Sequence, residues 1–183
     1  MADPGPTARA IGGLASLSSA RGLQAHAVEL TVADVLAALE EFPECVRYLN
    51  TRRSSGAVLK LDSEADVQDA LYLILRPWVR DLVPETPTGK TGNRFTIRDF
   101  LSRALRCVIE AKYVRNADHG KGISKEMHDD IEVYRHNPIC DSIVFFIYDP
   151  DALIPDQREL RRTIEHSRVY DGRSLTCRLI VKP

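Results

Sequence analysis

The sequence predicts a mixed α/β domain in which a central sheet has helices on both faces. Three observations indicate this class. Apolar residues recur at helical spacing in segments before residue 80 and after residue 124. Runs with strand-like alternation lie at 94–113 and 175–181. The run SIVFFIY at 142–148 is almost wholly apolar, which is typical of a strand covered on both faces. Helices and strands that alternate in this way favour a layered α/β architecture.

Composition sets limits on the partners and the compartment. The chain is 44% hydrophobic and carries a formal net charge of −1, so it has no global basic field to attract nucleic acid. Its longest apolar runs are too short to span a bilayer, and we expect no membrane association. The four cysteines are widely spaced and form no CxxC pair. This spacing argues against a zinc or disulfide framework and favours the reducing cytoplasm.

We divide the chain into three parts. Residues 1–24 are rich in Ala, Gly, Ser and Pro and are expected to form a flexible tail. Residues 25–61 are expected to form a helical extension. Its helix begins at Thr31, which makes a capping signal with Asp34, and it ends or breaks near Pro43. Residues 62–183 form the main domain.

The expected order of elements in the main domain is helix, three strands, helix, strand, helix, strand. In chain order they cover residues 64–79, 82–85, the two halves of 94–113, 124–136, 142–148, 155 onward and 175–181. Asp62 or Ser63 is the expected cap of the first helix. Residues 114–122 are expected to be a polar loop, and Asp171-Gly172 is expected to turn the chain into the last strand.

The segment 94–113 carries the candidate chemistry. A hairpin that turns near Ala104 brings Asp99 beside Glu110, with Lys112 two residues further along the same side. Two carboxylates and an ammonium on a half-buried sheet are costly to desolvate. A folded chain keeps such groups mainly to bind a metal or to do chemistry. The plainer alternative is a surface ion pair of Lys112 with one of the two acids.

Basic residues near this hairpin are candidates for contacting a substrate. The segment Gly89-Lys90-Thr91 is not a P-loop, because Pro84 stands where that motif requires a glycine and a strand follows instead of a helix. Lys90 in its Gly-containing loop is still a candidate for contacting a phosphate backbone. Arg115 and Lys121 are further candidates, because their segment directly follows the strand that carries Lys112.

The hairpin residues also carry a resemblance. Asp99, ten intervening residues and Glu110-Ala111-Lys112 resemble the D-x(n)-[DE]-x-K signature of the PD-(D/E)XK nuclease superfamily, and the element order resembles its core. Over about residues 62–164 the chain is similar to the DpnII/MboI-type restriction endonuclease domain. The stretches that carry this likeness are Asp66-Val67-Gln68, Arg98-Asp99-Phe100-Leu101, Ile109-Glu110-Ala111-Lys112, Asp130-Ile131 with Tyr134, His136-Asn137-Pro138 and Phe146-Ile147-Tyr148-Asp149-Pro150. Two departures are Glu126, where such domains often hold Gln, and Arg98, where Pro often precedes the Asp.

The resemblance implies a restriction-endonuclease-like fold and a Mg²⁺-dependent DNA endonuclease, with Mn²⁺ able to substitute, that serves bacterial restriction or anti-phage defence. It implies that Asp99, Glu110 and the backbone carbonyl of Ala111 bind the metal. It further implies that Lys112 orients or deprotonates the attacking water.

Several points stay open from the sequence. Asp66 or Asp69 on the preceding helix, or Glu85 on the short strand, is a candidate for a further metal ligand. The chain shows no target-recognition module beyond the core, so we expect a homodimer or an assembly with a partner defence protein. The alternatives are a non-catalytic nuclease-fold module that binds nucleic acid or protein, and an RNase.

Overall fold

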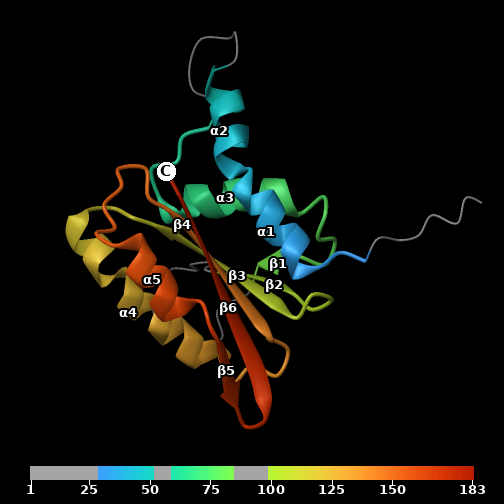
Figure 1. The fold of residues 1–183 in the computed structure, drawn as a ribbon. Helices are drawn as coiled ribbons and strands as arrows, with labels where there is room; N and C mark the ends of the chain where they lie inside the picture. The colour runs from blue at the N-terminus through green and yellow to red at the C-terminus, as the bar shows by residue number, and fades with distance from the viewer. Residues whose placement is uncertain (1–28, 52–58, 85–98) are drawn as a thin grey trace, which may run out of the picture.

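The computed structural model describes residues 29–51, 59–84 and 99–183, and for Asp99 it describes the backbone alone. In this part of the chain, six strands form one mixed sheet in the order β1-β2-β3-β4-β6-β5 (Figure 1). The strands are β1 (Val83–Pro84), β2 (Asp99–Ser102), β3 (Cys107–Tyr113), β4 (Ser142–Tyr148), β5 (Ser167–Tyr170) and β6 (Arg173–Lys182). The helices are α1 (Val32–Glu40), α2 (Phe42–Thr51), α3 (Glu64–Leu75), α4 (Ala117–Tyr134) and α5 (Gln157–Ile164).

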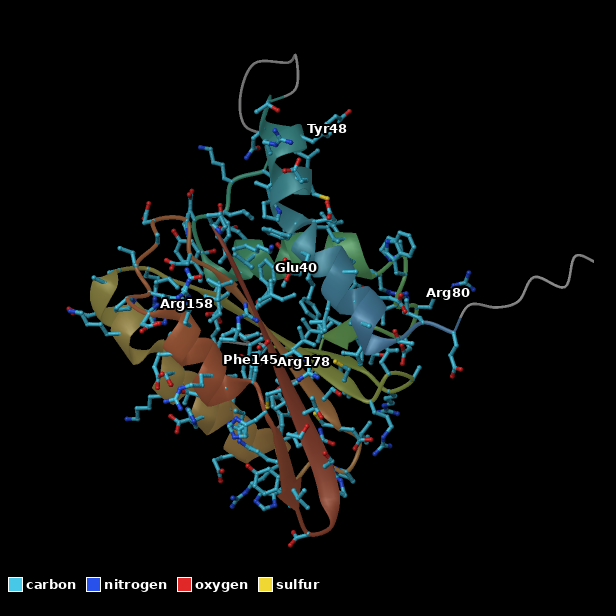
Figure 2. The ribbon with its side chains drawn as sticks, in the orientation of Figure 1. Glu40, Tyr48, Arg80, Phe145, Arg158 and Arg178 are labelled. Carbon is cyan, nitrogen blue, oxygen red and sulfur yellow. The ribbon has the colours of Figure 1, made fainter. Side chains whose placement is uncertain are left out.

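Helices cover both faces of the sheet, as the sequence predicted. On one face α1 and α3 pack against Ile109, Val144 and Phe146. On the other face α4 and α5 pack against Val108 and Phe145. Phe145 is labelled near the centre of the molecule in Figure 2. Both faces of β4 are therefore covered, which explains its almost wholly apolar sequence. The predicted α/β class, a central mixed sheet with helices on both faces, is confirmed.

Strand pairing builds the predicted hairpin. β2 and β3 are antiparallel, with Asp99 opposite Glu110 and Ser102 opposite Cys107, so residues 103–106 make the connection. The predicted turn near Ala104 is confirmed. β1 pairs with β2 as the expected short strand. β4 pairs parallel to both β3 and β6, so the carboxyl ends of these three strands lie at one edge of the sheet.

The N-terminal helices belong to the same core as α3. Val35, Leu39 and Phe42 are buried with the side chains of α3. Pro43 lies in the first turn of α2, where its missing N–H costs no helical hydrogen bond, so the break predicted near Pro43 is the start of a second helix. Glu40, labelled in Figure 2, forms an ion pair with Lys182 of β6 and ties α1 to the sheet. The division at residue 62 stays a prediction, and the tail of residues 1–24 lies outside the described residues.

The prediction of a polar loop over residues 114–122 is wrong from residue 117 onward, because α4 begins there. Asn116 caps the helix: its side-chain oxygen accepts a hydrogen bond of 2.8 Å from the backbone N–H of His119. Gly120 is buried, and a Cβ on it would lie 2.4 Å from the carbonyl oxygen of Leu153. The glycine that indicated a loop is therefore required for helix packing.

Other boundaries differ by smaller amounts. α3 ends at Leu75, ahead of Pro77, and α5 begins at Gln157 with Asp156 as its cap. β5 was not predicted, and it forms a hairpin with β6 across Asp171 and Gly172, whose φ values of 49° and 79° suit a tight hairpin turn. Within the residues that the structure describes, no helix has the length and apolar character needed to cross a membrane.

Candidate active site

Two charged residues are buried on the central strand β3. Glu110 is 1% exposed and Lys112 is 6% exposed, which is rare for ionisable residues unless they are paired. Alternation along the strand puts both on the face of Val108, which α4 covers. Ala111 lies between them, fully buried on the opposite face.

Lys112 lies between two carboxylates. Its Nζ donates a hydrogen bond of 2.8 Å to Glu110 Oε1 and lies 2.7 Å from Asp130 Oδ2 of α4. Attraction to both acids outweighs the effect of burial and holds the pKa of Lys112 above its ordinary value, so the amine is protonated. The ion pair is buried, unlike the surface pair that the sequence left as an alternative.

Glu110 has spare capacity to bind a cation. Its Oε2 atom is buried and has no hydrogen-bond partner among the described residues. Burial raises the pKa of Glu110, Lys112 lowers it, and the nearby Asp130 and Glu64 raise it further, leaving it above its ordinary value. An unpartnered buried carboxylate oxygen costs free energy that a bound cation offsets. A hard divalent ion therefore fits this position.

Asp99 lies opposite Glu110 in the β2–β3 ladder, so the register predicted from the sequence is confirmed. The described side chains include no cluster of three or more Asp, Glu, His or Cys arranged around a metal position, and the side chain of Asp99 is outside that description. The hairpin thus brings together the three residues predicted for catalysis along two adjacent strands.

Asp66 and Asp69 of α3 are the acids predicted as candidates for a further metal ligand, and that role stays a prediction. Asp66 Oδ2 accepts hydrogen bonds of 2.7 Å from Ser63 Oγ and 3.0 Å from the backbone N–H of Asp62, which is a helix-cap arrangement. Asp69 is exposed. Glu64 at the start of α3 is instead the acid of this helix whose charge acts on Glu110. The sequence analysis did not single out Glu64; its candidates for a further metal ligand were Asp66, Asp69 and Glu85.

Of the predicted substrate-binding residues, the structure describes Arg115 and Lys121. Arg115 is exposed just beyond β3, and its backbone N–H donates to Nδ1 of His119 over 3.3 Å. Lys121 is exposed on α4, lies 3.3 Å from Asp118 and lines a shallow hollow between α4 and α5. Lys90 and Glu85 lie outside the described residues. Their roles stay predictions.

A second polar contact, which was not predicted from the sequence, anchors the start of α4. The His119 side chain is 6% exposed, and its Nε2 lies 3.2 Å from Glu126 Oε1. Because Nδ1 accepts the backbone N–H of Arg115, the ring proton belongs on Nε2, where it donates to Glu126. Glu126 is one turn ahead of Asp130, so this contact and the Lys112 pair hold the same face of α4.

Comparison with known proteins adds one match. A family model described as REase_DpnII-MboI matches residues 33–181. The match runs from α1 to the end of β6 and is wider than the stretch over which the sequence motifs lie. Comparison with curated proteins found no match, and comparison with solved structures found no matching structure.

Proposed function

The chain belongs to the DpnII-MboI restriction endonuclease family, and from this premise we propose that it is a metal-dependent endonuclease that hydrolyses phosphodiester bonds of DNA. We propose Mg²⁺ as the ion, with Mn²⁺ able to replace it, and a role in bacterial restriction or anti-phage defence. Membership of the family supports DNA as the substrate. The identity of the metal and the role in defence go beyond what the family supports and are part of the proposal.

One observation carries the proposal. Glu110 keeps a buried oxygen that has no hydrogen-bond partner among the described residues, two positions from the buried ammonium of Lys112. Asp99 lies opposite on the next strand. A purely structural ion pair gains stability only when its remaining lone pairs are satisfied. An unsatisfied carboxylate on the central strand instead supports a site that receives a ligand.

Each residue has a distinct role in this proposal. Asp99, Glu110 and the backbone carbonyl of Ala111 hold the ion. A bound Mg²⁺ supplies Lewis-acid stabilisation of the negative charge that develops on the phosphate. Lys112 donates a hydrogen bond to the attacking water and stabilises the transition state, and its burial strengthens that interaction because water does not screen it.

The proposal extends to the assembly, the DNA contacts and the compartment. One site of this kind cuts one strand at a time, so we propose a homodimer, or an assembly with a partner defence protein, for double-strand cleavage. Arg115, Lys121 and Lys90 are proposed to contact the phosphate backbone. The four cysteines are free, which supports the cytoplasm as the compartment.

The test is a cleavage assay on supercoiled plasmid, linear duplex and RNA in Mg²⁺, in Mn²⁺ and in EDTA. Wild type is expected to nick or linearise the plasmid with either metal and to be inactive in EDTA. Glu110→Ala and Lys112→Ala are expected to be inactive. Lys125→Ala and Glu132→Ala change exposed residues of α4 and serve as matched controls that keep activity.

Three results would redirect or reject the proposal. Cleavage of RNA alone would indicate an RNase. Binding of DNA with every substrate intact would indicate the non-catalytic module. Equal cleavage by wild type, Glu110→Ala and Lys112→Ala would show that the cutting does not come from this site.

A further inference from the structure

Lys112 depends on counter-charges that come from two different elements. Glu110 Oε1 approaches it from within β3 at 2.8 Å, and Asp130 Oδ2 approaches from α4 at 2.7 Å. The lysine side chain is 8% exposed, so water solvates the ammonium very little. A buried charge of this kind is tolerated only while it is paired. Both carboxylates therefore help to hold the Lys112 ammonium in its buried position.

A bound metal ion would affect these two carboxylates differently. If Glu110 directs its charge to a divalent cation, as the proposed function requires, Lys112 loses part of its nearest counter-charge. The two positive charges also repel each other. Asp130 lies on α4, across from the β2–β3 hairpin that holds the proposed ligands, and its carboxylate stays available to Lys112.

Neighbouring acids of α4 do not fill this role. Glu126, one turn earlier, lies 3.2 Å from His119 Nε2. Asp129, the adjacent residue, is exposed. Asp130 side-chain atoms are mostly shielded, with 28% exposed, and its Oδ2 is buried.

We propose that Asp130 is a positioning residue that holds Lys112 in the site by its charge while Glu110 binds the metal ion. The inference rests on the proposed function. It assigns a role to a residue outside the D…ExK signature. It also predicts an energetic coupling between Asp130 and Lys112 that appears in metal binding without DNA.

A double-mutant cycle tests this coupling. Mn²⁺ binding is measured by titration calorimetry on wild type, Asp130→Asn, Lys112→Met and the double variant. Asp130→Asn leaves Lys112 dependent on Glu110 and is expected to weaken Mn²⁺ binding by about tenfold. In the Lys112→Met background the same change is expected to alter the affinity by less than about twofold, because there is no ammonium to hold.

Controls separate charge, position and folding. Asp129→Asn removes the same charge from the adjacent exposed position and is expected to bind Mn²⁺ and cut plasmid like wild type. Asp130→Glu keeps the charge and is expected to restore most of the affinity and cleavage that Asp130→Asn loses. Thermal unfolding of each variant shows which are folded. If Asp130→Asn does not fold, the Mn²⁺ affinities of Asp130→Glu and of the double variant are compared with that of Lys112→Met instead.

The outcomes are distinct. If Asp130→Asn weakens Mn²⁺ binding equally in both backgrounds, Asp130 is a direct ligand and the positioning role is overturned. If Asp129→Asn weakens Mn²⁺ binding as much as Asp130→Asn does, the effect is not specific to Asp130 and the positioning role is also overturned. Wild-type binding and cleavage by Asp130→Asn would reject this inference alone. A wild-type protein that neither binds Mn²⁺ nor cuts any substrate would reject the proposed function instead.

Discussion

Gly120 of α4 and Leu153 of the loop after β4 lie closer together than a residue with a side chain would allow. A Cβ on Gly120 would be 2.4 Å from the Leu153 carbonyl oxygen and 2.8 Å from its carbonyl carbon. These neighbours are backbone atoms, so neither can move aside cheaply. The contact fixes α4, the helix that brings Asp130 to Lys112.

Gly120→Ala is expected to lower the free energy of unfolding by about 1–3 kcal/mol, because the added methyl overpacks this contact. Gly122→Ala is the matched control on the same helix, where a Cβ meets nothing within 4 Å. That change is expected to raise the free energy of unfolding by about 0.5–1 kcal/mol, since alanine favours a helix interior over glycine. Urea denaturation measures both, and an equal effect of the two substitutions would contradict the contact.

Asp149 at the end of β4 holds the same loop. It is 2% exposed, and its carboxylate accepts hydrogen bonds of 2.8 Å from Leu153 N–H and 3.1 Å from Ile154 N–H. Asp149→Ala is expected to cost about 1–3 kcal/mol of stability, because both donors lose their partner. Asp151→Ala, at an exposed position two residues on, is expected to change stability by less than about 0.5 kcal/mol. Denaturation that gives the same midpoint for both variants would argue against this role.

Asp81 couples stability to acid pH. Burial raises the pKa of Asp81, but hydrogen bonds of 2.8 Å from the Ala104 N–H and the Ser102 hydroxyl outweigh it and hold the pKa below its ordinary value of 3.8. The carboxylate therefore stabilises the fold above the unfolded-state pKa, and this stabilisation is lost as pH falls through the folded-state pKa.

The free energy of unfolding of Asp81→Asn is accordingly expected to fall less than that of the wild type as the pH drops from about 6 to about 3. Denaturant unfolding at a series of pH values measures this difference. Asp129→Asn, at an exposed position of α4, is the control and is expected to follow the wild-type curve. A wild-type pH dependence in Asp81→Asn would contradict the prediction.

The hairpin was predictable from the sequence because its register depends on local features. Strand alternation and a short connection near Ala104 determine that Asp99 lies opposite Glu110. The apolar run of β4 likewise shows its own burial. In both cases the pattern within a few residues contains the information that the fold uses.

The start of α4 was not predictable in this way. Its first residues are polar and include Gly120, which by propensity indicates a loop. The helix forms because Asn116 caps it and because Leu153, more than thirty residues later, requires the glycine. The sequence also could not decide between Asp66 and Asp69, because which acid of α3 approaches the hairpin depends on how α3 lies against β3. The sequence left the cap of α3 open between Asp62 and Ser63, and in the structure Ser63 is the cap. Asp66 accepts hydrogen bonds from Ser63 Oγ and from the Asp62 N–H.

Glu64 provides the last prediction, which concerns the metal site. Its charge raises the pKa of Glu110. If Glu64 helps to attract or hold the ion, Glu64→Gln is expected to raise the Mg²⁺ concentration that gives half-maximal plasmid cleavage by about tenfold. Cleavage at saturating Mg²⁺ is expected to recover largely, because added ion compensates for weaker binding. Asp66→Asn and Asp69→Asn, measured in the same titration, are expected to shift this concentration less, since Asp66 is hydrogen-bonded to Ser63, the cap of α3, and Asp69 is exposed. A larger shift for Asp69→Asn than for Glu64→Gln would instead support Asp69, one of the candidates that the sequence left open.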